Sequence, residues 1–375
     1  MNKKIAIVVH KGNVFLSHRV NIAEKAIKEG YEVHVLTDAS EAVAKEIKRK
    51  GIYFHQVPFS RTFKNIFFEF KTLIYLFNII RKLKPNLVHN VTIKPIIYVN
   101  LICKILRHKK IINSISGLGY IFVNKNLKNT ILKFFVLQLY KFFFKSENVR
   151  IILQNIEEKK YLEKYNIAYK GNLRLVPGAG VNMSKYIPSK NFENKNIIVF
   201  AARMIREKGV EDVVNASEKL VKMNYNVKLI LLGEVDEEYP THIKKNLLKS
   251  WSKKNYIEWH GHVDNIIPFY QMATLVCMPS YYSEGVPKSL IEAAAIAKPI
   301  ITTDMPGCRS IVKNNYNGLL VEPKNIASLV KNIKYLLDNP DICRTFGLNG
   351  RNYAKEMFDE TKIVKLTLDI YNEII

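Results

Sequence analysis

Short strand-like runs, most of them rich in apolar residues, alternate along the chain with longer segments of helical length. The runs fall at residues 5–9, 32–37, 53–57, 86–90 and 110–114 in the first half, and at 196–202, 227–233, 256–261, 275–278 and 318–321 in the second. Apolar runs of this length separated by helices are typical of parallel strands joined by right-handed crossovers. The pattern predicts an α/β architecture in both halves of the chain.

The junction after the first run is predicted to be a loop. Residues 5–9 lead into a glycine-containing segment, and a helical pattern begins near Ser17. A strand, a glycine-containing loop and a helix open a nucleotide-binding type of α/β fold. Open parallel sheets bind ligands beyond the carboxyl ends of their strands, so we expect the loops near Lys11, His89 and Ser116 to share one rim.

Length and composition fit two globular domains. The chain has 375 residues, of which 48% are hydrophobic and 24% charged, enough for two domains that each bury a core. Its four cysteines are far apart and form no Cys-x-x-Cys pair, which favours a reducing cytosol and argues against a zinc site. The first apolar run is too short for a secretory signal, and no stretch suits a membrane-spanning helix.

Positive charge gathers in the first half of the chain. The net charge is +25, with +22 in residues 1–185 and +3 in residues 186–375. Two segments of the basic half, 63–84 and 127–145, mix aromatic residues with Lys and Arg. Part of this apolar surface must be core, but such helices also suit an anionic membrane surface. Nucleic acid is the rival partner; it is not predicted, because the sequence shows neither spaced stacking aromatics nor a known binding motif.

Two carboxylates with seven residues between them, Glu284 and Glu292, form the first candidate site. The apolar run 275–278 ends shortly before Glu284, and Pro287 suits the first turn of a helix. Two glutamates on one helix are commonly solvated. Here the helix continues as the apolar segment 293–297, so Glu292 borders a buried face where an unpartnered carboxylate is costly. The spacing suits a ligand with hydroxyl groups at both ends and an anionic middle, such as a nucleotide sugar.

The anionic middle of such a ligand needs positive partners. We expect exposed amides near Gly285 and Val286, at the positive end of a helix dipole, to supply some of them. Arg203 and Lys208 follow the strand at 196–202 and form a candidate diphosphate clamp. Arg offers a planar fork of donors and Lys a movable point charge, although two surface cations are the simpler interpretation of such a pair.

The two motifs together resemble a known enzyme family. E-G-V-P-K-S-L-I-E, followed by K-P-I-I-T-T-D and P-G-C and preceded by R-x4-K-G, is similar to the E-x7-E signature of retaining GT-B glycosyltransferases. These form glycosyltransferase family 4, also called glycosyl transferases group 1, and the likeness is greatest to members that extend bacterial lipid-linked oligosaccharides. The resemblance implies two Rossmann-like doubly wound domains facing across a cleft, with a C-terminal helix crossing back to the first domain. The implied domains are 1–183 with 359–375, and 184–358.

The resemblance also implies roles for individual residues. Glu284 would orient the donor sugar, Arg203 and Lys208 would hold the diphosphate, and Glu292 would bind the ribose. The other implied donor-binding residues are Gly12, Asn13, Val263, Gly285 and Val286. One departure from the family pattern, Ala297 in place of a glycine, is expected to be structural.

The acceptor side is less well defined by the sequence. Ser116, followed by Gly117, stands where the family commonly presents His or Glu. His18 and His89 are candidates for the missing polar contact, although a lone histidine is more often structural.

No cofactor or metal is expected. The sequence has no Asp-x-Asp, and His260 with His262 lacks a third ligand nearby. We expect transfer of a hexose or N-acetylhexosamine from a UDP-sugar to a polyprenyl-diphosphate-linked glycan. The enzyme would be cytoplasmic and peripheral at the inner face of the cytoplasmic membrane, in capsule, lipopolysaccharide or protein-glycan assembly. The alternatives are a UDP-sugar epimerase or hydrolase of the same fold, and a non-catalytic basic protein that binds membrane or RNA.

Overall fold

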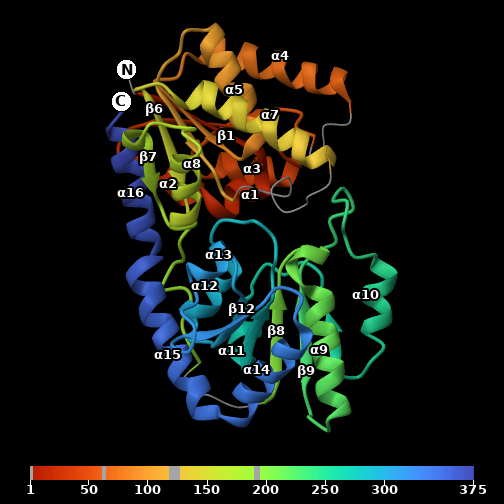
Figure 1. Cartoon of the computed structure of the whole chain (residues 1–375). Coiled ribbons are helices and arrows are strands. Elements are labelled where there is room, and N and C mark those ends of the chain that lie inside the picture. Colours follow the sequence, from red (N-terminus) through yellow and green to blue (C-terminus); the bar gives the residue numbers. More distant parts are fainter. Residues whose placement is uncertain (1–2, 61–64, 118–126, 190–194) are drawn as a thin grey trace. The chain divides into compact units, whose positions relative to one another are not determined.

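The computed structural model describes residues 3–60, 65–117, 127–189 and 195–375, and the chain divides into two compact units. The first unit holds residues 1–179 together with 360–375, and the second holds residues 180–359 (Figure 1). The division predicted from the sequence, at 183/184 and 358/359, lies close to these boundaries. The last helix of the chain therefore belongs to the first unit.

The first unit contains a parallel sheet of seven strands in the order β3-β2-β1-β4-β5-β6-β7. Its central strands β4 and β5 are buried along their whole length because helices cover both faces of the sheet. The elements are β1 (Lys4–Lys11), α1 (Gly12–His18), α2 (Val20–Lys28), β2 (Glu32–Asp38), α3 (Glu41–Arg49), β3 (Tyr53–Gln56), α4 (Ile66–Leu83), β4 (Leu87–Val91), α5 (Ile93–Ile105), β5 (Ile111–Ser114), α7 (Leu127–Phe144), β6 (Val149–Leu153), α8 (Ile156–Lys164), η1 (Lys170–Asn172), β7 (Leu173–Leu175) and α16 (Glu360–Asn372).

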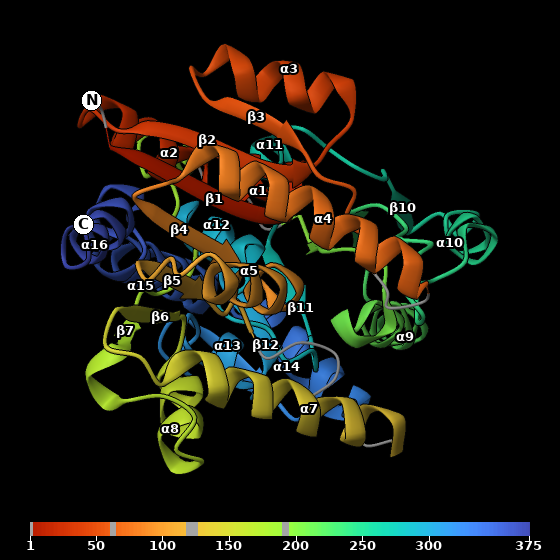
Figure 2. The same ribbon diagram turned by 90° about the horizontal axis from the view of Figure 1, so that it is seen from above.

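Two hydrophobic cores lie on the two faces of this sheet. On one face, β1 side chains such as Ile5 and Ile7 pack with Phe15, Ala23 and Leu368, which come from α1, α2 and α16. On the other face, α4, α5 and α7 cover the sheet, and α5 packs against both α4 and α7 (Figure 2). The surface formed by these three helices is called the α4–α5–α7 face below.

The second unit contains a parallel sheet of six strands in the order β10-β9-β8-β11-β12-β13. Taken from its first strand β8, this is the 3-2-1-4-5-6 order of a Rossmann fold. The elements are β8 (Ile197–Ala201), η2 (Arg206–Lys208), α9 (Val210–Lys222), β9 (Lys228–Leu232), α10 (Lys245–Trp251), β10 (Ile257–Trp259), α11 (Ile267–Met272), β11 (Leu275–Met278), α12 (Lys288–Ala295), β12 (Ile300–Thr303), α13 (Pro306–Arg309), β13 (Gly318–Val321), α14 (Ile326–Asp338) and α15 (Pro340–Met357).

Each strand predicted from an apolar run is present, but three expectations were wrong or incomplete. β1 passes directly into α1 at Gly12, so no loop separates the first strand from a helix at Ser17. Residues 173–175 form β7, a strand that was not predicted. The strands β6 and β12 were not predicted, because Val149–Leu153 contains an arginine and Ile300–Thr303 was taken only as part of a motif.

Helix α12 ends with a residue that carries unusual backbone strain. Ala297 has φ of 58°, and the amides of Ala297 and Lys298 donate to the carbonyls of Ala294 and Ala293 at 2.9 and 3.0 Å. This is a Schellman ending, whose left-handed position normally holds glycine. The alanine that departs from the family pattern therefore has a structural role, as expected.

Replacing Ala297 with glycine is expected to stabilise the second unit by about 0.5–1 kcal/mol. A Cβ in the left-handed region costs about 1–2 kcal/mol in the folded state, and glycine removes this cost. Glycine also has greater conformational entropy in the unfolded state, which offsets part of the gain. Both tryptophans of the chain, Trp251 and Trp259, lie in this unit, so urea unfolding followed by fluorescence reports it. The control is Ala327→Gly, on the exposed side of α14, which should lower stability. If both variants are less stable than wild type, Ala297 is not strained in the way proposed.

Candidate active site

The candidate site lies at the carboxyl edge of the second sheet, between β8 and β11. The chain winds one way from β8 to β10 and the other way from β11 to β13, so this edge is the topological switch point. Open α/β sheets bind their ligands there. The segment 202–209 follows β8 and carries two predicted site residues, and the segment 279–287 follows β11 and carries three.

Gly209 brings these two segments together. Its φ is +78°, and a Cβ added to it would lie 2.3 Å from the carbonyl oxygen of Pro279. Beside this contact, the amide of Tyr281 donates to the carbonyl of Glu207 at 2.8 Å. Only glycine permits so close an approach. The glycine of the Lys-Gly motif thus places Lys208 against the segment that follows β11.

Lys208 forms an ion pair with Glu284 at this junction. The two side chains are only 10% and 14% exposed, and Ser280 Oγ donates to Glu284 Oε1 at 2.9 Å. Charged hydrogen bonds in a largely dry site are strong, and they fix the carboxylate in position. The structure therefore brings together two of the three predicted catalytic residues and pairs them with each other. An anion that enters here competes with Glu284 for the ammonium group.

Arg203, the third predicted catalytic residue, is more exposed and also has an acidic partner. Its Nη1 lies 3.0 Å from Asp236 Oδ2, and its guanidinium carbon lies 5.3 Å from the ring centroid of Tyr239. The rings of Tyr239 and Tyr282 meet edge to face at 6.3 Å, and Lys208 Nζ lies 5.5 Å from the Tyr282 centroid. Sequence reasoning missed Asp236 and this tyrosine pair. Asp236 and Tyr239 could have been found only from their position just after β9, and Tyr282 only from its position after β11, two residues before Glu284.

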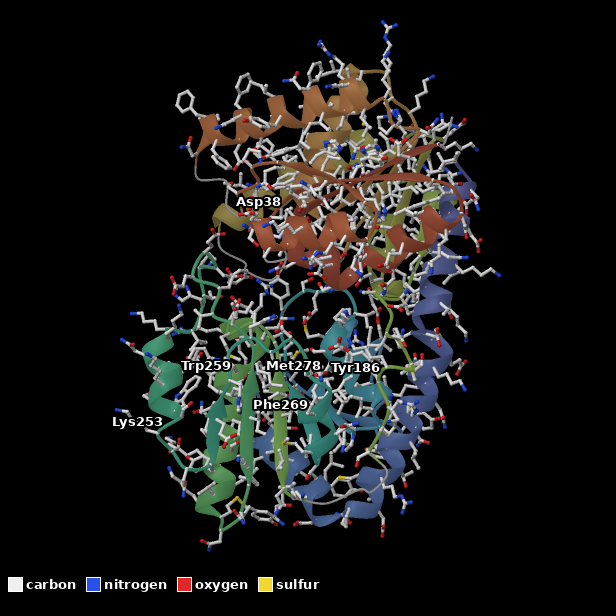
Figure 3. All side chains as sticks on the ribbon, turned by 180° about the vertical axis from the view of Figure 1, so that it is seen from behind. Asp38, Tyr186, Lys253, Trp259, Phe269 and Met278 are labelled. Carbon is white, nitrogen blue, oxygen red and sulfur yellow. The ribbon has the colours of Figure 1, made fainter. Side chains whose placement is uncertain are left out.

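Glu292 lies on α12 beside an apolar face, as predicted. Tyr186, which is labelled in Figure 3, donates its hydroxyl to Glu292 Oε1 at 2.7 Å. Lys288 Nζ lies 3.7 Å from the same oxygen. Burial raises the pKa of Glu292, while Lys288 and Tyr186 act in the opposite direction. Arg351 on α15 donates to the carbonyl of Tyr186 at 2.7 Å and so holds this tyrosine in place. The carboxylate has two fixed neighbours and accepting capacity for ligand hydroxyl groups.

Gly285 and Val286 are buried, whereas exposed amides at a helix start were expected here. Helix α12 begins only at Lys288, after Pro287, and the two glutamates are not on one continuous helix. Gly307 of the P-G-C motif explains the burial. A Cβ on Gly307 would lie 1.8 Å from the carbonyl oxygen of Gly285, so α13 packs directly on this backbone.

The segments after β9 and β10 complete this edge. The amide of Gly233 donates to the carbonyl of Gly261 at 2.6 Å, and a Cβ on Gly233 would lie 1.9 Å from the carbonyl oxygen of Ala202. Trp259 Nε1 donates to the carbonyl of Gly233 at 3.0 Å. Val263, two residues after Gly261, is half-buried against the core of the unit. Its contact with a nucleobase stays a prediction.

Family models place the chain among known proteins. Residues 183–353 match the model described as "Glycosyl transferases group 1", and residues 4–155 match the model described as "Glycosyl transferase 4-like". The chain holds a glycosyl transferases group 1 domain and a glycosyl transferase 4-like domain. It is therefore a transferase, and the predicted pair of Rossmann-like domains is confirmed by the two parallel sheets.

Two relatives align with this chain over nearly their whole length. One is the N,N'-diacetylbacillosaminyl-diphospho-undecaprenol alpha-1,3-N-acetylgalactosaminyltransferase of Campylobacter jejuni, which is 26% identical over 99% of each chain. The other is the capsular polysaccharide biosynthesis glycosyltransferase CapM of Staphylococcus aureus, 23% identical over 92% of this chain and 90% of CapM. Among solved structures, Anabaena HepE in complex with UDP-glucose has the same fold, with a TM-score of 0.80 at 15% identity over 99% of each chain.

The donor-binding residues predicted in the first unit of this transferase are Gly12 and Asn13. Gly12 is buried, and a Cβ added to it would lie 2.7 Å from a methyl group of Val43 and 2.8 Å from Ala39 Cβ. Packing against α3 is thus a sufficient reason for glycine at this position. Asn13 is exposed at the start of α1, and a contact of either residue with the donor stays a prediction.

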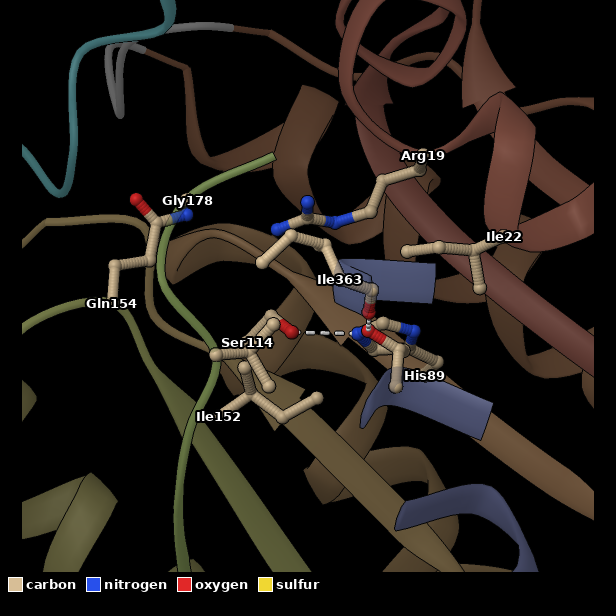
Figure 4. Close-up of a pocket in the computed structure, with 10 residues that line it drawn as sticks. Arg19, Ile22, His89, Ser114, Ile152, Gln154, Gly178 and Ile363 are labelled. Carbon is tan, nitrogen blue, oxygen red and sulfur yellow. Dashed lines mark hydrogen bonds between the residues drawn. The ribbon is translucent and has the colours of Figure 1, made fainter. Parts of the chain in front are cut away.

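Three of the four predicted acceptor-side residues gather around Arg19, which sequence reasoning missed. Arg19 Nη1 donates to the carbonyl of His18 at 3.0 Å, and Nη2 donates to Ser116 Oγ at 3.4 Å. Arg19 and His89 line one cavity (Figure 4). His89 is 1% exposed, and its ring nitrogens lie 2.7 Å from Tyr371 Oη and 2.6 Å from Ser114 Oγ. These bonds join β4, β5 and α16; a contact of His89 with an acceptor stays a prediction.

Gly117, the fourth acceptor-side candidate, has a buried carboxylate as its neighbour. Its φ is +90°, and its amide donates to Glu158 in the first turn of α8. The amide of Gln154 also donates to Glu158 Oε2, at 3.1 Å. Burial raises the pKa of Glu158 to about 7, although these donors favour the charged form.

Glu158→Gln is expected to stabilise the first unit at pH 8 by about 2 kcal/mol and to have little effect at pH 4.5. The folded state keeps a proton that the unfolded carboxyl releases above its ordinary pKa of 4.5. Wild-type stability therefore falls as the pH rises from there to about 7, and the variant lacks this fall. Hydrogen exchange of peptides from β6 and α8 at the two pH values measures the difference. An equal effect at both pH values would contradict it, and Glu157→Gln is the matched control.

The described residues contain neither a metal-ligand cluster nor a membrane-spanning helix. Within residues 3–60, 65–117, 127–189 and 195–375, no group of three or more His, Cys, Asp or Glu side chains could hold a metal ion. His260 and His262 lie near Glu258 and Asp264 at 3.2 and 3.4 Å. None of the described helices combines the length and the hydrophobicity that crossing a bilayer requires.

Proposed function

We propose that this protein is a retaining glycosyltransferase that moves a hexose or N-acetylhexosamine from a UDP-sugar to a polyprenyl-diphosphate-linked saccharide. The observation that carries the proposal is the Lys208–Glu284 ion pair at the switch point, with Arg203 on the same segment as Lys208. Two cations suit a diphosphate, and a fixed carboxylate suits the hydroxyl groups of a sugar. Glu292, held by Tyr186, suits the ribose.

In the proposed reaction the bond between the sugar carbon and the diphosphate oxygen breaks, and a bond from the acceptor oxygen to that carbon forms. The acceptor attacks from the face that the diphosphate leaves, and a donor phosphate oxygen takes the acceptor proton. The electron pair of the broken bond stays on the diphosphate. Lys208 and Arg203 stabilise this developing charge, so neither an enzyme nucleophile nor a metal ion enters the proposal.

The choice of donor and acceptor draws on the relatives. The Campylobacter jejuni enzyme is named for an undecaprenol-diphosphate-linked acceptor, and the Staphylococcus aureus protein for capsular polysaccharide. HepE was solved with UDP-glucose bound. These names support a UDP-sugar donor and a lipid-linked acceptor for this chain.

The α4–α5–α7 face supports action at a membrane surface. Phe67, Phe70, Phe134 and Phe142 are 83%, 64%, 58% and 59% exposed. Other exposed apolar residues on the face are Ile66, Ile74, Tyr75, Leu101, Ile105, Ile131, Phe135 and Leu139. The one acidic residue in the sequences of these helices is Glu69, which pairs with Lys94 at 2.7 Å.

The positive charge of this face favours an anionic lipid surface as its partner. Lys104 Nζ lies 3.4 Å from the ring centroid of Phe142, so exposed cations and exposed rings are neighbours. Rings that enter the headgroup region beside lysines suit anionic lipid. We place the protein at the cytoplasmic face of the membrane on this basis. Of the five clustered phenylalanines in α7, Phe143 and Phe144 are core instead.

The test incubates the purified protein with several UDP-sugars, with and without a bacterial undecaprenyl-diphosphate-saccharide extract. Release of UDP and formation of a lipid-linked product should both depend on the extract and be lost in Glu284→Ala. The anomeric configuration of the product, read by NMR, tests retention. Conversion of the donor without extract would show an epimerase or hydrolase instead, and the absence of any donor consumption would favour a binding protein.

A further inference from the structure

Arg19 is a buried cation without a counter-ion. It joins α1 to α2, its side chain is 6% exposed, and its Nε–H has no hydrogen-bond acceptor among the described residues. Nη1 and Nη2 donate to neutral oxygens, those of His18 and Ser116. In the part of the chain that the structure describes, no carboxylate lies within ion-pair distance of Arg19. Burial lowers the pKa of Arg19, but a guanidinium group stays protonated at neutral pH.

The cavity beside Arg19 offers no compensating charge. Its volume of about 10 Å³ admits about one oxygen atom. The wall is made of Arg19, Ile22, His89, Ser114, Ile152, Gln154, Val176, Gly178, Ile363 and Thr367 (Figure 4). None of these is acidic, and burial lowers the pKa of His89 to about 3, so that it is neutral. An uncompensated buried charge is costly, and an anion from outside the chain would remove that cost.

The cavity also lies where a parallel sheet binds ligands. Ser114 is the last residue of β5, and Gln154 and Val176 come directly after β6 and β7. These three strands are neighbours, so the cavity is at the carboxyl edge of the first sheet. Ser116, the residue at the position that the family gives to an acceptor-side group, accepts a hydrogen bond from Arg19.

We propose that Arg19 and this cavity form an anion subsite that takes one phosphoryl oxygen of the acceptor, an inference that rests on the proposed function. The Nε–H that lacks an acceptor donates to this oxygen. A guanidinium group recognises phosphate oxygens through a planar fork of donors, whereas a lysine offers only a point charge. The diphosphate of a lipid-linked saccharide is the phosphoryl group that the proposed acceptor carries at its reducing end.

The experiment compares two soluble acceptors that share one saccharide. One carries the saccharide on geranyl diphosphate, and the other carries it on a neutral alkyl chain. Arg19→Gln is expected to raise KM for the diphosphate acceptor on the order of 10- to 100-fold. KM for the UDP-sugar, and kcat/KM for the neutral acceptor, should stay within about twofold. Arg19→Lys should fall between wild type and Arg19→Gln, because it keeps the charge and loses the fork. Arg49→Gln, at an exposed position of α3, is the matched control.

A binding measurement on the wild-type protein decides the matter if Arg19→Gln does not fold. The Arg19 Nε–H resonance, in protein labelled with ¹⁵N-arginine and assigned by Arg19→Lys, should shift with geranyl diphosphate. It should not shift with UDP or with inorganic phosphate at the same concentration. Three results would overturn the proposal. The first is an equal resonance shift with UDP or phosphate, and the second is no shift with any probe. The third is an equal loss of activity on both acceptors in Arg19→Gln. If no saccharide transfer is found at all, the proposed function fails, and the titration still tests the subsite.

Discussion

Replacing Lys208 with methionine is expected to lower kcat on the order of 10²- to 10³-fold, the usual cost of removing one donor that stabilises developing charge. Lys208 is mostly buried and paired with Glu284, so its charge is poorly screened by water. The diphosphate gains negative charge as the sugar leaves, and the interaction with the ammonium group strengthens in that state. The loss should therefore appear in kcat more than in KM for the UDP-sugar.

The matched control for this prediction is Lys222→Met. Lys222 is in the last turn of α9 of the same unit, and its side chain is 73% exposed. Steady-state kinetics with a saturating acceptor, together with the unfolding midpoint of each variant, separates catalysis from folding. A Lys208→Met enzyme with a raised donor KM and an unchanged kcat would show that Lys208 only binds the ground state.

Replacing four phenylalanines of the α4–α5–α7 face with serine is expected to weaken binding to anionic vesicles on the order of 10³-fold. The variant changes Phe67, Phe70, Phe134 and Phe142, which are all more than half exposed. A ring that leaves water for the membrane interface contributes roughly 1 kcal/mol or more, and four such rings give that factor. Because the rings do not belong to the core, the unfolding midpoint should change little.

Vesicle sedimentation at several salt concentrations measures this binding. Wild-type binding should weaken as salt rises, since lysines of the face attract anionic lipid through screened charge. The control variant replaces four exposed apolar residues of the second unit with serine: Met223, Met272, Leu348 and Met357. If both fourfold variants bind vesicles as tightly as wild type, the membrane does not contact the proposed face.

Much of the fold was predictable from the sequence because parallel strands buried on both faces consist mainly of apolar residues. Leu275–Met278 and Gly318–Val321 were located to the residue for this reason. β6 and β7 were missed because an arginine interrupts each strand, Arg150 in β6 and Arg174 in β7. Both arginines form ion pairs with Glu373, which lies 199 residues beyond Arg174. No local sequence pattern indicates a contact between residues so far apart in the chain.

The sequence by itself determined the residue types and spacing of the candidate site, namely a Lys-Gly pair after one strand and a glutamate after another. Tertiary structure decided which of these residues meet. Gly209 packs on Pro279 and thereby pairs Lys208 with Glu284, because two strands far apart in the chain lie side by side at the switch point. Only the tertiary structure revealed Arg19, since the feature that distinguishes it is a buried charge without a counter-ion. That feature depends on what surrounds a side chain in space, which spacing along the sequence does not record.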